Sequence, residues 1–167
     1  MGQRLLPQNL IELYTHALAI EREAFKRFLE LERYMREVGC DYLADEFERI
    51  GKEEQEQYEA LAIGTAERDL PAIAQWEYAW HYLGPDADKV RAPQSARDAL
   101  GLALATERRA QNFYVDVAEH ATDDAVCAFA AEMAADEQRH VQRLEELLAR
   151  EPQAAKSADD DAELVRR

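Results

Sequence analysis

The chain is poor in the residues that interrupt helices and in the thiols that build cysteine metal sites. Its 167 residues include only 6 Gly, 5 Pro and 2 Cys. Cys40 and Cys127 form no CxxC pair, so we expect two buried thiols rather than a disulfide or a thiolate site. Ala, Leu, Glu, Arg and Gln dominate instead, and all of them favour helix. The composition therefore predicts an all-α protein.

Long apolar runs and positive charge are missing as well. No apolar stretch approaches the roughly 18 residues that suggest a transmembrane helix, and the N-terminal MGQRLLPQNL lacks the apolar segment of a signal peptide. The formal net charge is −15, which argues against binding to nucleic acid or to an anionic membrane surface. We therefore expect one folded cytoplasmic domain that contacts neither nucleic acid nor membrane.

Helix start and stop signals predict four long helices and one short one. The predicted ranges are 9–38, 41–63, 71–83, 96–120 and 123–150. Gly39 is suited to end the first helix, and Asp41 is expected to cap the second. Thr122 and Asp123 can cap the last.

The long helices form two hairpins, the first with the second and the fourth with the fifth. Residues 64–94 then become a crossover that carries the short helix, which is a four-helix bundle with one long connection. We place this bundle domain at 1–150, and residues 151–167, which lack an apolar face, read as a disordered acidic tail. Trp76 and Trp80 on the short helix are expected to cover the side of the bundle, or alternatively to form a dimer surface.

Each long helix carries a glutamate in the middle of an otherwise apolar face. At steps of three and four, the core faces read Tyr14, Ala17, Glu21, Ala24, Phe28, Leu31 and Met35; Leu43, Phe47, Ile50, Glu54, Gln57 and Leu61; Leu100, Ala103, Glu107, Ala110, Tyr114 and Val117; and Val126, Phe129 (with Ala130), Met133, Glu137, His140, Leu144 and Leu147. Glutamate is almost never fully buried unless it is paired, and four converging carboxylates would repel one another. Two divalent cations would balance their four negative charges.

A repeat relates the two hairpins. EREAFKRF (21–28) and ERRAQNFY (107–114) share a glutamate, an alanine three residues later and an aromatic residue seven residues later. KEEQEQYEAL (52–61) and ADEQRHVQRL (135–144) align Glu54 with Glu137 and Gln57 with His140. The chain therefore reads as a duplicated helical hairpin.

These motifs, spread over residues 9–150, resemble the rubrerythrin-like branch of the ferritin-like superfamily. Its core pattern is one Glu from each of two helices and a Glu-x-x-His from each of the other two. The resemblance implies a ferritin-like bundle with a dinuclear metal site. The site would hold two Fe ions, with Mn or a mixed pair as alternatives, and would react with O₂ or H₂O₂.

The resemblance also implies individual roles. Glu21 and Glu107 would each supply a single carboxylate, and Glu54 and Glu137 would be bridging or terminal ligands. His140 would bind one metal through a ring nitrogen. The hydroxyl of Tyr114 would form a hydrogen bond with a ligand carboxylate.

The sequence departs from the family pattern in two ways. It lacks the C-terminal rubredoxin domain with CxxC pairs, so electrons would come from an external donor. Gln57 stands where the pattern has histidine, and its neutral carbonyl oxygen is a poorer ligand for iron, so Gln57 is a weak or absent ligand. Leu104 and Ala110, on either side of Glu107, do not supply the additional carboxylate of some rubrerythrins.

The other polar residues are assigned to the surface. His16, His81 and His120 are expected at the surface or rim, the last of them favoured there by the helix dipole. Glu53 and Glu56 are expected to be solvated. Gly51 costs about 1 kcal/mol against Ala in a helix, and close packing beside the site would account for it.

Three hypotheses for function follow. The first is a homo-oligomer, most simply a dimer, that acts as a ferroxidase or peroxidase in iron handling or oxidative-stress defence. The second is a di-iron oxygenase that acts on an organic substrate. The third is a protein without catalysis: a metal store or carrier, or a scaffold that has lost its metals through Gln57.

Overall fold

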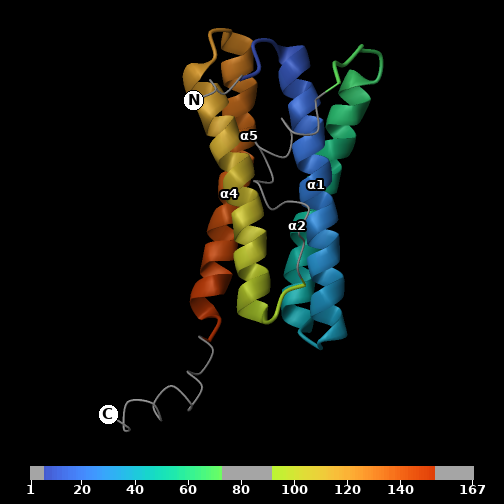
Figure 1. Ribbon diagram of the computed structural model, residues 1–167, viewed down its shortest axis with the longest axis vertical. Helices are drawn as coiled ribbons and strands as arrows, with labels where there is room; N and C mark the ends of the chain where they lie inside the picture. The colour runs from blue at the N-terminus through green and yellow to red at the C-terminus, as the bar shows by residue number, and fades with distance from the viewer. Residues whose placement is uncertain (1–5, 73–91, 153–167) are drawn as a thin grey trace, which may run out of the picture.

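The computed structural model describes residues 6–72 and 92–152, which form four helices in two antiparallel hairpins (Figure 1). Helix α1 (Leu10–Glu37) packs on α2 (Asp41–Thr65), and α4 (Ala96–His120) packs on α5 (Asp124–Arg150). The two hairpin turns lie at opposite ends of the bundle, and α2 ends at the end opposite to the start of α4. Over these residues the chain is an all-α, ferritin-like four-helix bundle with one long crossover, which confirms the predicted fold class.

Two predicted segments lie outside the described residues. They are most of the short helix at 71–83, with Trp76, Trp80 and His81, and most of the tail at 151–167. Among the described residues, no helix combines the length and hydrophobicity that a membrane-spanning segment requires.

The turn between α1 and α2 depends on one glycine. Gly39 has φ 75°, a left-handed conformation that suits glycine. Its N–H donates to the carbonyl of Arg36 at 3.1 Å, and the N–H of Cys40 donates to the carbonyl of Met35 at 2.8 Å, so the helix ends in a Schellman motif. The expected cap is wrong here: Cys40 occupies the N-cap of α2, and Asp41 is the first helical residue.

Of the two residues predicted as N-cap candidates for α5, one caps the helix. The side chain of Asp123 accepts hydrogen bonds from the backbone N–H groups of Ala125 and Val126, at 2.9 and 3.0 Å. Asp123 is therefore the N-cap, and Thr122 lies one residue before it. A carboxylate at this position also complements the positive end of the helix dipole.

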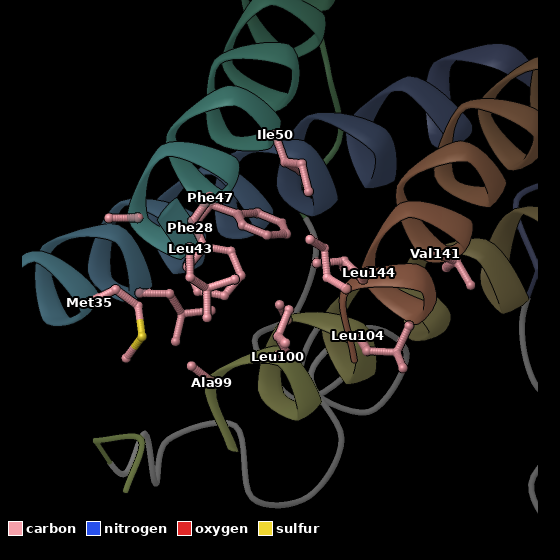
Figure 2. Packing of buried hydrophobic residues seen from close by; sticks show 14 residues of the cluster. Phe28, Met35, Leu43, Phe47, Ile50, Ala99, Leu100, Leu104, Val141 and Leu144 are labelled. Atoms are coloured by element: carbon pink, nitrogen blue, oxygen red, sulfur yellow. The ribbon is translucent and has the colours of Figure 1, made fainter. Parts of the chain in front are cut away.

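Two hydrophobic clusters fill the bundle, one on each side of its middle. The first joins the C-terminal half of α1 and the N-terminal half of α2 to the facing halves of α4 and α5, and Figure 2 shows Phe28 and Phe47 opposite Leu100 and Leu144. The second includes Leu13 and the other halves of α1, α4 and α5. Both clusters exclude water from the layer between them, where the four glutamates lie.

In the N-terminal half of α1, the buried residues differ from the predicted apolar stripe. Leu13 and Ile20 are buried there, whereas Tyr14 is half-buried and packs edge to face on the half-buried Phe129, with ring centroids 5.0 Å apart. Because Leu13 and Tyr14 differ by about 100° around the helix, the rotation of α1 in the bundle decides which of them faces inward.

Three further expectations can be compared with the structure. Leu61 is half-buried rather than buried. Both cysteines are free, and each is half-buried. A Cβ on Gly51 would lie 3.1 Å from the Cβ of Phe28, so this glycine allows α1 and α2 to approach closely beside the predicted site.

Candidate metal centre

The four predicted glutamates, one from each helix, meet in the middle of the bundle. Glu21, Glu54 and Glu107 are 0% exposed, Glu137 is 1% exposed and His140 is 4% exposed. One ligand atom from each of Glu54, Glu107, Glu137 and His140 can be chosen so that all four atoms lie within 4.8 Å of one another. The structure therefore brings these four side chains together although Glu54 and His140 are 86 residues apart in the sequence, and Glu21 lies outside this set.

Most of the oxygens in this carboxylate cluster have no donor. Across the described residues, six of the eight carboxylate oxygens of the four glutamates are buried without a hydrogen-bond partner. They are Oε2 of Glu21, both oxygens of Glu54, Oε1 of Glu107 and both oxygens of Glu137. Buried polar groups are normally paired, and an unpaired buried carboxylate is more costly than a neutral group. So many unpaired acceptors in one place indicate a site for cations.

Burial changes the protonation of these carboxyls. It raises the pKa of Glu21 well above its usual value, and the charge of Glu54 adds to the rise. Burial also raises the pKa of Glu137 well above its usual value, and the charges of Glu54, Glu107 and Glu21 add to the rise. It also raises the pKa of Glu107, although the hydrogen bond from His140 opposes this effect. Without metal ions, the repulsion is relieved by protons on the carboxyls or by a cationic side chain beside them.

His140 lies at the edge of the cluster and contacts it through one ring nitrogen. Its Nδ1 is 2.7 Å from Oε1 of Glu54 and 3.1 Å from Oε2 of Glu107, and only the second contact has hydrogen-bond geometry. Burial opposes the charged imidazolium, but these two carboxylates outweigh it and raise the pKa of His140 to about 11. Without metal, His140 is therefore the cationic partner of the cluster.

Glu53 is partly solvated, as expected, but it also contacts the cluster, which the prediction did not include. Its side chain is 41% exposed, yet its Oε2 lies 2.8 Å from Nε2 of His140, the nitrogen that faces away from the cluster. Partial burial raises the pKa of Glu53, but the hydrogen bond and charge of His140, together with Arg49, outweigh it, so the net pKa is lowered. A carboxylate on the outer nitrogen of a metal-binding histidine fixes the ring and its tautomer. One signal was available in the sequence, because Glu53 immediately precedes a candidate ligand.

Gln57 has a similar contact on the other side of the site. Its Nε2 donates to Oδ2 of Asp136 at 3.1 Å, and its Oε1 is buried with no hydrogen-bond partner among the described residues. Asp136 immediately precedes Glu137, as Glu53 precedes Glu54. Asp136 was not among the predicted site residues, although the repeat aligns it with Glu53.

Tyr114 lies where the resemblance implied. Its ring is 0% exposed, and its hydroxyl donates to Oε1 of Glu21 at 2.8 Å. Burial and the neighbouring carboxylate of Glu21 raise the pKa of Tyr114 well above its usual value. The hydroxyl therefore keeps its proton and holds one oxygen of Glu21, which leaves the other oxygen free for a ligand.

The remaining candidate residues lie away from the cluster. His16 is half-buried against Phe113, with ring centroids 5.6 Å apart. His120 is exposed at the end of α4, where its Nδ1 lies 2.9 Å from the carbonyl of Asp116. Glu56 is exposed, as expected. Leu104 and Ala110 are each 4% exposed and add only apolar surface beside Glu107.

The donor set fits a pair of divalent cations. Four carboxylates and one imidazole supply hard and intermediate ligands of the kind that suit iron and manganese. The charge is also appropriate, because two divalent ions would match the four glutamates. Glu21, Glu54, Glu107, Glu137 and His140 are the residues that could hold them.

Comparisons with known proteins agree with this arrangement. The family model described as Rubrerythrin matches residues 12–148. A crystal structure of an uncharacterized conserved protein from Magnetospirillum magnetotacticum MS-1 superposes with a TM-score of 0.78 at 25% identity, covering 89% of this chain and 99% of that one. Among curated proteins, none matches this chain. The bundle, its buried carboxylate–histidine cluster and the family match together identify the chain as a member of the rubrerythrin family.

Proposed function

We propose that this protein holds two Fe ions in the carboxylate–histidine cluster and acts as a ferroxidase or peroxidase. The observation that carries the proposal is the set of six buried carboxylate oxygens without hydrogen-bond partners among the described residues. When bound, the iron pair would supply the redox chemistry with O₂ or H₂O₂. The external electron donor, the homodimer and the cytoplasmic location expected from the sequence belong to the same proposal.

The protein side chains would position and isolate the ions. Glu53 accepts from Nε2 of His140, which leaves Nδ1 directed at the cluster as a ligand atom. Tyr114 holds one oxygen of Glu21. The hydrophobic clusters on both sides keep bulk water away, so charges in the site are poorly screened and the ligands need little rearrangement.

Anaerobic titration of the metal-free protein with Fe(II) tests the proposal. We expect two irons per chain, a raised melting temperature, and consumption of O₂ or H₂O₂ with a new near-ultraviolet absorption band on exposure to the oxidant. Glu107→Ala should lose metal, whereas Glu56→Gln, at an exposed position on α2, should keep it. Absence of iron binding, with an unchanged melting temperature, would exclude the metal function altogether.

One observation favours oxidation of an organic substrate as a second candidate. A cavity of about 310 Å³ reaches Gln57 and Met133 and has Leu61, Phe129 and Tyr14 in its wall. Small-molecule sites are typically concave and largely apolar. Oxygen uptake that depends stoichiometrically on an added organic compound would favour this candidate, and uptake that depends on Fe(II) or H₂O₂ alone would favour the first.

A further inference from the structure

The side-chain amide of Gln57 has a defined orientation. The amide nitrogen of Gln57 faces Asp136 and donates to its Oδ2 at 3.1 Å, so the carbonyl oxygen on the same carbon points away from Asp136. Asp136 is itself held in place, because Nη2 of Arg139 donates to its Oδ1 at 2.5 Å. The structure thus fixes an amide whose buried Oε1 has no donor among the described residues.

The repeat indicates where that oxygen lies. Glu53 precedes Glu54 and contacts His140, three residues after Glu137; Asp136 precedes Glu137 and contacts Gln57, three residues after Glu54. In this correspondence, Nε2 of Gln57 takes the place of Nε2 of His140. Oε1 of Gln57 then takes the place of Nδ1 of His140, the atom that lies 2.7 Å from Glu54.

We propose that Gln57 is a neutral oxygen ligand held by Asp136, and that the two halves of the centre prefer different ions. The half beside His140 offers imidazole and carboxylate and suits Fe²⁺. The half beside Gln57 offers only oxygen atoms, which suit harder cations such as Mn²⁺. This inference rests on the proposed dinuclear site, which iron alone can fill; the preference of the Gln57 half applies where Mn²⁺ competes with Fe²⁺. It makes Asp136 a positioning residue.

The cavity beside Gln57 supports a hard cation in that half. Gln57 and Met133 contribute to its wall, and Met133 lies four residues before the candidate ligand Glu137. Water is among the ligands that suit hard divalent cations such as Mn²⁺. A space of about 310 Å³ next to the oxygen-only half leaves room for such water.

Competition between the two metals tests the inference without any assay of activity. Metal-free protein is mixed anaerobically with equimolar Fe²⁺ and Mn²⁺ and desalted, and the bound metals are measured by mass spectrometry and by the electron paramagnetic resonance of Mn²⁺. We expect the wild-type chain to retain both metals. Gln57→His should raise the Fe-to-Mn ratio about tenfold, the lower end of the effects seen when the surroundings of a metal site change.

A second pair of variants tests the role of Asp136. Asp136→Asn keeps the size of the side chain, but its amide can donate to Oε1 of Gln57. The Gln57 amide could then flip by 180° and direct its nitrogen, instead of its oxygen, away from residue 136. We expect it to lower bound Mn about tenfold and to leave bound Fe unchanged. Glu132→Gln, at an exposed position four residues earlier on α5, should change neither metal.

Three outcomes would overturn the inference. One is a wild-type chain whose Fe-to-Mn ratio is already as high as that of Gln57→His. Another is a Gln57→Leu variant, with a wild-type melting curve by circular dichroism, that still binds two ions. The third is an Asp136→Asn variant with wild-type Mn content. Failure of the wild-type chain to bind either metal would instead reject the proposed function itself.

Discussion

His140 and Gln57 occupy equivalent positions in the two hairpins, yet they are bound into the protein in different ways. His140 contacts three carboxylates, those of Glu53, Glu54 and Glu107. Among the described residues, Gln57 has one side-chain hydrogen bond, to Asp136. The outer carboxylate is retained in both halves, but only His140 brings a positive charge into the cluster. The two halves therefore share an outer carboxylate and differ in the charge of the side chain that it holds.

The largest expected effect is a loss of stability when His140 is replaced, and it is compared with the loss when Gln57 is replaced. In the metal-free protein, His140→Ala removes the buried cation and leaves Glu54 and Glu107 uncompensated. We expect the free energy of unfolding at pH 7 to fall by about 3 to 5 kcal/mol, as when one partner of a buried ion pair is removed. Gln57→Ala removes a single hydrogen bond of a half-buried side chain and should cost about 1 kcal/mol.

Urea unfolding followed by circular dichroism measures both changes. His140→Gln is the matched control, because it makes the two halves alike and can still donate one hydrogen bond. It should lie between His140→Ala and the wild type. Equal losses for His140→Ala and Gln57→Ala would mean that the positive charge of His140 does not contribute to the free energy of unfolding.

A pH series sharpens the comparison in the metal-free protein. A group whose pKa is higher in the folded state stabilises the fold below its unfolded pKa, and this stabilisation is lost as the pH rises through its folded pKa. The raised pKa values of Glu21, Glu107 and Glu137 and the value of about 11 for His140 all act in this direction. Between pH 7 and pH 9 we expect stability to fall by on the order of 1 kcal/mol per pH unit.

Melting temperatures across this range provide the measurement. In His140→Gln the histidine contribution is absent, so the slope should become shallower. Metal-loaded protein should show the opposite trend, because cations replace the protons and bind more tightly as the pH rises. A metal-free wild type that becomes more stable from pH 7 to pH 9 would contradict the electrostatic account of the cluster.

A smaller effect is expected at Tyr114, which the repeat aligns with Phe28. Tyr114→Phe makes this pair of positions identical and removes the hydrogen bond to Oε1 of Glu21. We expect a loss of about 1 to 2 kcal/mol in the metal-free protein, because a buried acceptor loses its donor. In metal-loaded protein the loss should be smaller, since cations can satisfy that oxygen. A loss that is the same with and without metal would place Glu21 outside the metal site.

The smallest effect is expected at the outer carboxylate. Glu53→Gln keeps a hydrogen-bonding side chain beside Nε2 of His140 but removes its charge. Because Glu53 is 41% exposed, we expect less than about 1 kcal/mol of lost stability. The affinity for the His140-side metal should fall about tenfold, which isothermal titration calorimetry can measure. Glu56→Gln, one turn further along α2, is the control, and an equal affinity change there would refute a specific role for Glu53.

The amino-acid sequence was sufficient to predict the four long helices, the pairing of the hairpins and the buried glutamates. Helical periodicity of 3.6 residues defines an inward face, and a glutamate in the middle of each such face is visible without coordinates. The repeat then aligned Gln57 with His140. These features depend on spacing along a single helix, so a linear pattern is sufficient to reveal them.

Packing of the four helices determines which residues at the edges of those faces contact the side chains of the metal site. Glu53 and Asp136 lie one position off the core stripes, so the pattern alone places them in solvent, yet each reaches across to a side chain on a different helix. Tyr14 and Phe129 show the reverse, since they lie on the predicted stripes and are only half-buried. The rotation and separation of neighbouring helices set these contacts, and both arise from packing among all four helices rather than from the periodicity of any one of them.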